Sequence, residues 1–257
     1  MIAAFMSHRG SVREDNQDRL QLGAHVISTE TQQPMNISLE KSPLLVSVID
    51  GMGGYEGGAR AAQILAALLS DISRLLPDAS AEQDADFIEE TLHKAATMMQ
   101  KEALGDPQLK NMGATLAGLI LREKSVLAFN CGDCRVYRFT SGYLEKITHD
   151  HSIVQRLCDE GEITEEEMRH HPNKNIVLSA ISGAENETFT LYTKTLSRCD
   201  SDEFFLCSDG VWEMLETKQL EEYLSLGRAG ISKIADALFA AKCRDNISFI
   251  HLTSQPI

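Results

Sequence analysis

Four short stretches of the sequence place aspartate in a turn beside glycine or asparagine, and their carboxylates are the groups most able to do chemistry. The stretches are Arg13-Glu14-Asp15-Asn16-Gln17-Asp18, Asp50-Gly51-Met52-Gly53-Gly54, Gly132-Asp133-Cys134-Arg135, and Ser208-Asp209-Gly210 together with Asp245-Asn246. Unpaired carboxylates that share a site raise one another's pKa and destabilise the fold. A divalent cation removes that conflict, and hard oxygen ligands suit magnesium or manganese better than zinc.

Three of these aspartates follow apolar runs that are typical of strands. Residues 44–49 precede Asp50, residues 126–129 precede Asp133, and residues 204–207 precede Asp209. Strands that end in this way indicate one sheet edge at which several carboxylates converge. The sequence therefore predicts a metal site assembled from distant segments of the chain.

In their order along the chain and in their residues, the four stretches resemble the motifs of the metal-dependent protein phosphatases of the type 2C (PPM) family, particularly its compact bacterial members. The resemblance runs from about Met1 to Leu252 and includes Thr148-His149-Asp150-His151-Ser152 and His171-Pro172-Asn173-Lys174-Asn175. Asp-Gly alone is an ordinary turn, so the joint match carries the identification. The resemblance implies a phosphatase that hydrolyses phosphoserine and phosphothreonine in proteins with two to three Mn²⁺ or Mg²⁺ ions.

The resemblance also implies a role for each acidic residue. Asp50 would bridge two metal ions, the Gly51 carbonyl would add an oxygen ligand, and Asp209 and Asp245 would hold the second ion. Asp133 would make a third, weaker site with Asp209, although it could also be an ordinary turn residue. A metal pair activates water for in-line attack on phosphorus, so no side-chain nucleophile or phosphoenzyme is expected.

Four further positions bear on the chemistry. Arg13 matches the position that grips the substrate phosphate, because a planar guanidinium can bind two phosphate oxygens. Asp18 matches a carboxylate near the metals that acts through water or in the outer coordination layer. Gln17 stands where many members have glutamate, and Met52 where many eukaryotic relatives have histidine. These two departures leave open the metal affinity and the source of the proton for the leaving oxygen.

Other interpretations of these residues remain. A non-catalytic phosphoprotein-binding relative would keep the fold but lose metal ligands, and a regulatory protein that binds metal would lack Arg13 and a phosphate pocket. Cys131 and Cys134 form a CxxC pattern, but a zinc site needs two more soft ligands nearby, and the sequence offers none. The phosphatase interpretation is favoured because the metal-ligand candidates Asp50, Asp209 and Asp245 are all retained.

Bulk properties favour one domain over residues 1–257, since 43% of the residues are apolar and no linker-like tract divides the chain. The net charge of −14 argues against nucleic acid or an anionic membrane as a partner. No secretory signal or transmembrane stretch is evident, so a cytoplasmic protein is expected. The family implies a monomer, and the absence of kinase motifs implies that a separate bacterial Ser/Thr kinase phosphorylates its substrates.

The hydrophobic pattern predicts an α+β protein with antiparallel sheets, and the resemblance sharpens this to a four-layer αββα sandwich with the metals at one end. A flap-like segment is expected around residues 152–183; its acidic part, 160–167, either attracts basic peptides or is a solvated helix capped by Thr164. Residues 28–42 are expected to form a long hairpin loop. The strands are expected at 3–7, 18–24, 44–49, 114–121, 126–131, 135–139, 189–195, 203–207 and 247–252, and the helices at 58–76, 81–104, 152–160, 210–224 and 230–242.

Overall fold

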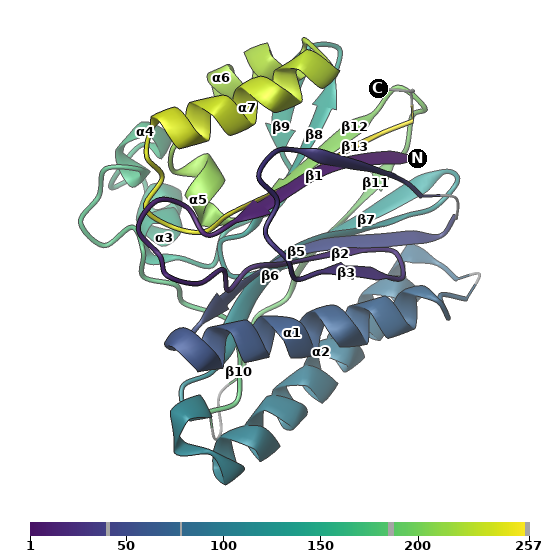
Figure 1. Cartoon of the computed structure of the whole chain (residues 1–257). Helices are drawn as coiled ribbons and strands as arrows, with labels where there is room; N and C mark the ends of the chain where they lie inside the picture. Colours follow the sequence, from purple (N-terminus) through teal and green to yellow (C-terminus); the bar gives the residue numbers. More distant parts are fainter. Residues whose placement is uncertain (40–41, 78, 185–187, 255–257) are drawn as a thin grey trace.

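Two antiparallel sheets lie face to face in the computed structural model, which describes residues 1–39, 42–77, 79–184 and 188–254. Helices cover both outer faces of this pair of sheets (Figure 1). The predicted α+β sandwich, with its four layers, is therefore confirmed. None of the helices in the described part of the chain is long and apolar enough to span a membrane.

The first sheet has the order β4-β1-β13-β12-β8-β9 and joins the two ends of the chain. In this sheet β1 pairs with β13, in register from Ile2 opposite Thr253 to His8 opposite Ile247. The bounds of its strands are β1 Ile2–His8, β4 Met35–Ser38, β8 Arg135–Thr140, β9 Tyr143–Lys146, β12 Glu203–Cys207 and β13 Ile247–Thr253.

The second sheet has the order β11-β7-β6-β5-β2-β3, and the short β10 pairs with β6. Its strands β5, β6 and β7 are almost fully buried, which explains their continuous runs of apolar residues. The bounds are β2 Arg19–Leu22, β3 His25–Ile27, β5 Leu44–Met52, β6 Gly113–Leu121, β7 Ser125–Cys131, β10 Ile181–Ser182 and β11 Tyr192–Ser197.

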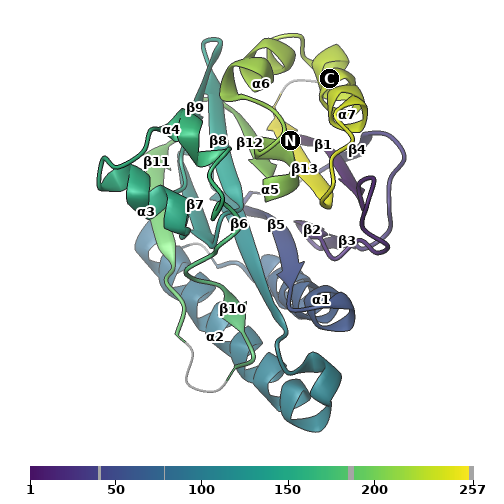
Figure 2. The ribbon, with the colours of Figure 1, turned by 90° about the vertical axis from the view of Figure 1, so that its left-hand side faces the viewer.

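Helices pack on the outside of each sheet. The helices α1 (Tyr55–Ser73) and α2 (Ala81–Gly105) cover the second sheet, while α6 (Thr217–Leu224) and α7 (Arg228–Ala240) cover the first. The short helices α3 (Ile153–Asp159), α4 (Glu165–Met168) and α5 (Asp209–Trp212) gather at one end of the sandwich (Figure 2). The 3₁₀ turn η1 (Pro107–Leu109) follows α2.

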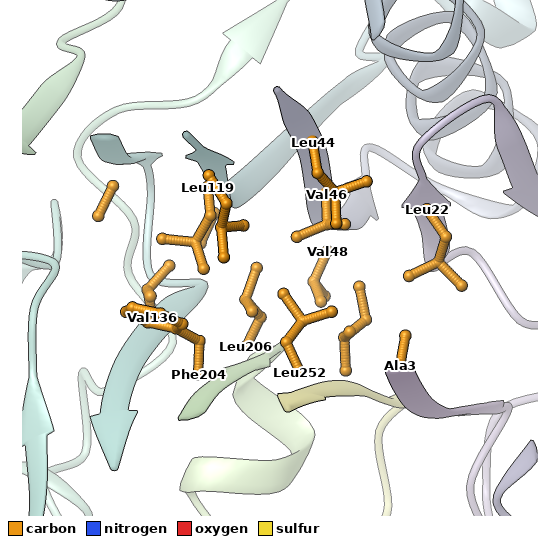
Figure 3. Close-up of a cluster of buried hydrophobic side chains, with 14 of the residues drawn as sticks. Ala3, Leu22, Leu44, Val46, Val48, Leu119, Val136, Phe204, Leu206 and Leu252 are labelled. Carbon is orange, nitrogen blue, oxygen red and sulfur yellow. The ribbon is translucent and has the colours of Figure 1, made fainter. Parts of the chain in front are cut away.

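Three hydrophobic clusters separate the four layers. The central cluster lies between the sheets and takes inward-facing side chains such as Val46, Leu119, Leu206 and Leu252 from both of them (Figure 3). The other two clusters lie beneath α1 and α2 and beneath α6 and α7. Burial of these side chains supplies the main force that holds the layers together.

Some predicted boundaries are wrong. Residues 40 and 41 of the predicted loop 28–42 lie outside the described residues. The rest is not only a loop, because β4 pairs there with β1 as a largely exposed edge strand. The strand predicted at 189–195 runs instead over Tyr192–Ser197. The helix predicted over 210–224 is two helices, since Glu216 caps α6 in a box with Gln219 and the Leu215 carbonyl accepts a hydrogen bond from Arg169.

Candidate active site

A cavity of about 590 Å³ opens at the end of the sandwich where α5 begins. It brings together every residue predicted for the site except Asp18, from three loops, the end of one strand and the first residue of one helix. The predicted residues along its wall are Arg13, Gln17, Asp50, Gly51, Asp133, Asp209 and Asp245.

Each carboxylate is placed by the element that carries it. Asp50 lies near the end of β5, paired in register with Thr115, and Asp133 lies in the turn between β7 and β8. Asp209 is the first residue of α5, and Asp245 lies in the loop before β13. The predicted convergence of strand ends therefore describes how the carboxylates meet.

Gly51 is needed because β5 and α1 approach very closely. A Cβ atom on Gly51 would lie 2.3 Å from the carbonyl oxygen of Gly58, and one on Gly58 would lie 2.2 Å from Oε1 of Gln17. The first contact cannot be relieved without movement of the backbone. The second requires the Gln17 side chain to move, and a Cβ atom on Gly58 would also lie 2.8 Å from the carbonyl carbon of Gly51. The two glycines thus allow the first turn of α1 to lie directly against the strand that carries Asp50.

Asn246 connects the two loops that carry Arg13 and Asp245. Its Oδ1 accepts a hydrogen bond of 2.8 Å from the Gln17 amide, and its Nδ2 donates to the carbonyl oxygens of Arg9 and Asp15. The sequence pattern singled out Asn246 only as a neighbour of Asp245. Its position next to that aspartate was the only hint in the sequence. Its partners could not be predicted, because the hydrogen bond to Gln17 spans 229 residues of sequence.

Asp18 lies behind the cavity wall and is completely buried. Its Oδ2 accepts a hydrogen bond of 2.9 Å from the Ser208 hydroxyl, while its Oδ1 has no hydrogen-bond partner. Burial raises the pKa of Asp18 to about 6, and the hydroxyls of Ser248 and Ser208 limit the rise. An unpartnered buried carboxylate oxygen beside the cavity is an acceptor that a cation or its water would satisfy.

The carboxylates around the cavity disfavour one another's charged form. Burial raises the pKa of Asp50 well above its ordinary value, and repulsion from Asp18 and Asp209 adds to the rise. Burial and then Asp133 act in the same direction on the pKa of Asp209. The pKa of Asp133 rises to about 7, chiefly through burial and then through Asp150. Several hard oxygen donors with uncompensated charge are a donor set that fits divalent cations.

Arg13 forms a two-pronged ion pair with Asp245. Its Nε and Nη2 donate to Oδ1 and Oδ2 of that carboxylate at 2.8 and 2.7 Å. Both side chains are more than a third exposed, so the pair faces the cavity and not the core. In the described part of the chain, no three His, Cys, Asp or Glu side chains are already arranged to hold a metal ion.

The segment 152–183 contributes the residues on one side of the cavity. Asn175, Ile176 and Val177 line it, and Ile176 is 42% exposed. Lys174 pairs with Glu213 at the end of α5, which fixes these residues relative to Asp209. The acidic part of the segment is helix α4, capped by Thr164 as predicted.

Among the described residues that line the cavity, none offers a thiol or imidazole nucleophile. Cys131 and Cys134 are fully buried, and burial raises the pKa of both thiols, that of Cys131 to about 12. They are therefore protonated, structural side chains. His151 is structural too, because its Nδ1 accepts a hydrogen bond of 3.0 Å from the Gly132 amide.

The chain is similar to known phosphatases along nearly its whole length. Residues 32–240 match the family model described as protein phosphatase 2C. A serine/threonine phosphatase, Stp, of Listeria monocytogenes is 33% identical over 97% of this chain and 94% of the relative. The crystal structure of the Mycobacterium tuberculosis serine/threonine phosphatase PstP is 25% identical, with a TM-score of 0.81 and 99% of each chain covered. A further structure, of the PstP catalytic domain with two manganese ions, has a TM-score of 0.77 at 25% identity over 98% of each chain.

Proposed function

The chain belongs to the protein phosphatase 2C family, and from this premise we propose that its cavity hydrolyses phosphoserine and phosphothreonine in proteins. The chain is a metal-dependent serine/threonine protein phosphatase. The observation that carries the assignment of the cavity is the meeting of Asp50, Asp133, Asp209 and Asp245 with Arg13 around one opening. Anionic oxygen donors beside a guanidinium fit a metal-bound phosphate ester.

We assign two to three Mn²⁺ or Mg²⁺ ions to these carboxylates. Asp50 and the Gly51 carbonyl, with Asp209 and Asp245, would hold a pair of ions, and Asp133 with Asp209 would hold a third. Bound divalent ions supply an activated water for in-line displacement at phosphorus. Gln17 lines the cavity and Asp18 lies just behind it. Both are therefore assigned to the residues that contact the ions through water or through their direct ligands.

Arg13 is assigned to the substrate phosphate. Its guanidinium already presents two donors in parallel to a pair of oxygens on Asp245, which is the geometry that a phosphate also accepts. Because Asp245 is assigned to a metal, binding of metal and binding of substrate both require this pair to separate. Arg13 would then exchange a carboxylate for a phosphate without a change in the kind of interaction.

The proton for the leaving oxygen is assigned to water. Met52 occupies the position after Asp50-Gly51, and none of the side chains along the cavity wall is a histidine. Aryl phosphates need little protonation of their leaving group, whereas serine and threonine alkoxides need a great deal. The two classes of substrate should therefore respond differently to loss of any group that orders this water.

We further propose that the protein acts as a monomer in the cytoplasm of a bacterium, in signalling through phosphoproteins. Its substrates would be made by a separate Ser/Thr kinase. The acidic net charge supports proteins, and not nucleic acid or anionic membranes, as partners.

Turnover of a phosphothreonine peptide tests the proposal. Hydrolysis should require added manganese or magnesium and should stop when a chelator is added. Activity that survives exhaustive chelation and dialysis would exclude the metal mechanism. Metal-independent binding of the same peptide without turnover would instead indicate a phosphoprotein-binding protein.

A further inference from the structure

A second pocket, of about 470 Å³, adjoins the candidate active site. The two share Arg13, Asn175 and Asp245, so the second pocket begins at the residue assigned to the substrate phosphate. Consecutive residues of an extended peptide lie 3.8 Å apart at Cα. A substrate whose phosphate lies against Arg13 therefore has neighbouring residues within reach of this pocket.

The wall of this pocket is mostly apolar although it is open to solvent. Val12 and Met214, which line it, are 57% and 38% exposed, so no other part of the described chain covers them. The active-site cavity has exposed apolar side chains of its own, Met52 and Ile176. Large apolar side chains that gather around a binding site and stay exposed mark a surface for an apolar ligand.

The pocket is built from segments that are fixed to one another. The Ser11 hydroxyl donates to the carbonyl oxygens of Lys242 and Cys243, and the Cys243 thiol donates to the Gly210 carbonyl at 3.1 Å. The Lys174–Glu213 ion pair holds the remaining side. A ligand therefore meets a preformed wall, which lowers the entropic cost of binding.

The wall of the pocket carries one more positive side chain than negative ones. Arg13 pairs with Asp245 and Lys174 pairs with Glu213, which leaves Arg244 on the wall with no ion pair among the described residues. This side chain is exposed. An uncompensated cation disfavours a lysine or arginine on the ligand.

We propose that this pocket binds an apolar side chain of the phosphoprotein substrate, one or two residues from the phosphorylated residue. The proposal rests on the proposed function and adds a preference for sequence to it. The substrates are then phosphoproteins with a residue such as leucine beside the phosphoserine or phosphothreonine, and without a basic residue at that position.

A set of phosphothreonine peptides tests the proposal. Leucine, serine or lysine is placed singly at each of the two positions before and after phosphothreonine in a Ser/Gly background, and kcat/KM is measured with manganese. At one of these positions leucine should exceed serine by about tenfold, the discrimination that a partly apolar pocket gives to added hydrocarbon, and lysine should fall below serine.

Substitutions locate the source of the preference. Val12→Ser and Met214→Ser should each reduce the leucine-to-serine ratio toward one, and both change side chains that are more than a third exposed. Leu104→Ser is the matched control, because Leu104 is 83% exposed at the end of α2 and lines neither pocket. This control should keep the full ratio.

The outcomes separate the two proposals. A wild-type enzyme that turns over all peptides equally, that prefers lysine, or that keeps its leucine preference in both pocket variants overturns the pocket assignment and leaves the phosphatase function standing. An enzyme that hydrolyses neither the peptides nor an aryl phosphate with manganese overturns the proposed function and this inference with it.

Discussion

Asp50 is the single residue on which the proposed metal site depends most. Its carboxylate is assigned to two ions at once, and an amide in its place is neutral and a poorer ligand. Asp50→Asn should therefore abolish turnover while the pairing of β5 with β6 keeps the fold intact. Metal titration by calorimetry, together with peptide kinetics, checks this expectation; an active variant that still binds two ions would show that Asp50 does not bridge them.

Asp133 is assigned only to the third, weaker ion, so its loss should leave the paired ions bound. Its backbone carbonyl, which accepts a hydrogen bond from the Trp212 indole at 2.9 Å, is unaffected by a change of side chain. Asp133→Ala should fold, keep two ions and lose turnover of phosphopeptides, with a smaller loss on an aryl phosphate. Full activity on phosphopeptides would return Asp133 to the role of a turn residue.

Arg13 should contribute to substrate binding more than to metal binding. Loss of a charge-assisted pair of hydrogen bonds should raise KM for a phosphopeptide by about tenfold to a hundredfold in Arg13→Ala. Arg13→Lys, which keeps the charge but not the two-pronged geometry, should lie between the wild type and this variant. Metal content at saturating manganese should be unchanged in both, because all the assigned metal ligands are retained. If KM and kcat are also unchanged, Arg13 is an ordinary surface charge.

At the scale of elements, the sequence was most informative where an apolar run ends in aspartate. The strands before Asp50, Asp133 and Asp209 lie where their runs predicted, because buried strands require continuous apolar residues. β4 was missed because an exposed edge strand carries no such pattern. The division between α5 and α6 was missed for a different reason: the local capping box of Glu216 and Gln219 was overlooked, and the hydrogen bond from Arg169 to Leu215 is tertiary.

The site shows the same limit. Its carboxylates could be named from the sequence because each has a local motif and a family counterpart. The role of Asn246 depends on contacts with Arg9 and Asp15, and the adjoining pocket depends on four segments meeting, from Val12 to Arg244. Neither leaves a local pattern, so only the folded chain reveals them.

The contact between β5 and α1 should be sensitive to a single methyl group. In Gly58→Ala the new Cβ would collide with Oε1 of Gln17 and with the backbone of Gly51, and overpacking of this kind costs about 1–3 kcal/mol. Gly105→Ala is the control, since a Cβ there meets nothing within 4 Å. Thermal melting should show a loss for the first variant only, and manganese affinity should fall with it because Gly51 is displaced. Equal melting temperatures would show that the contact is adaptable.

The whole molecule joins its two ends at the site. β1 and β13 are neighbours inside one sheet, and the Ser7 and Ser248 hydroxyls lie 2.9 Å apart across 241 residues of sequence. The loop after β1 carries Arg13, and the loop before β13 carries Asp245. The cavity is therefore complete only when the whole chain is folded, so metal binding should stabilise the entire domain and not one segment.

The buried carboxyls of the site predict an unusual dependence of stability on pH. Asp18 and Asp133 have pKa values raised to about 6 and about 7 by burial, so without metal the folded state binds more protons than the unfolded state between about pH 4 and pH 7. The stability that these two carboxyls contribute is then fully present below their pKa in the unfolded chain. It is lost as the pH rises through their pKa values in the folded protein. The chelated protein should melt at a lower temperature at pH 7.5 than at pH 5.5.

Metal ions should reverse that trend, because they bind the ionised carboxylates and only in the folded state. Manganese should raise the melting temperature more at pH 7.5 than at pH 5.5, where protons compete for the same oxygens. Asp133→Asn removes one of the raised carboxyls, so in chelator its melting temperature should fall less between the two pH values than that of the wild type. A chelated wild type that becomes more stable as the pH rises, or a manganese effect that does not depend on pH, would show that burial and neighbouring charges do not raise the pKa of these carboxyls.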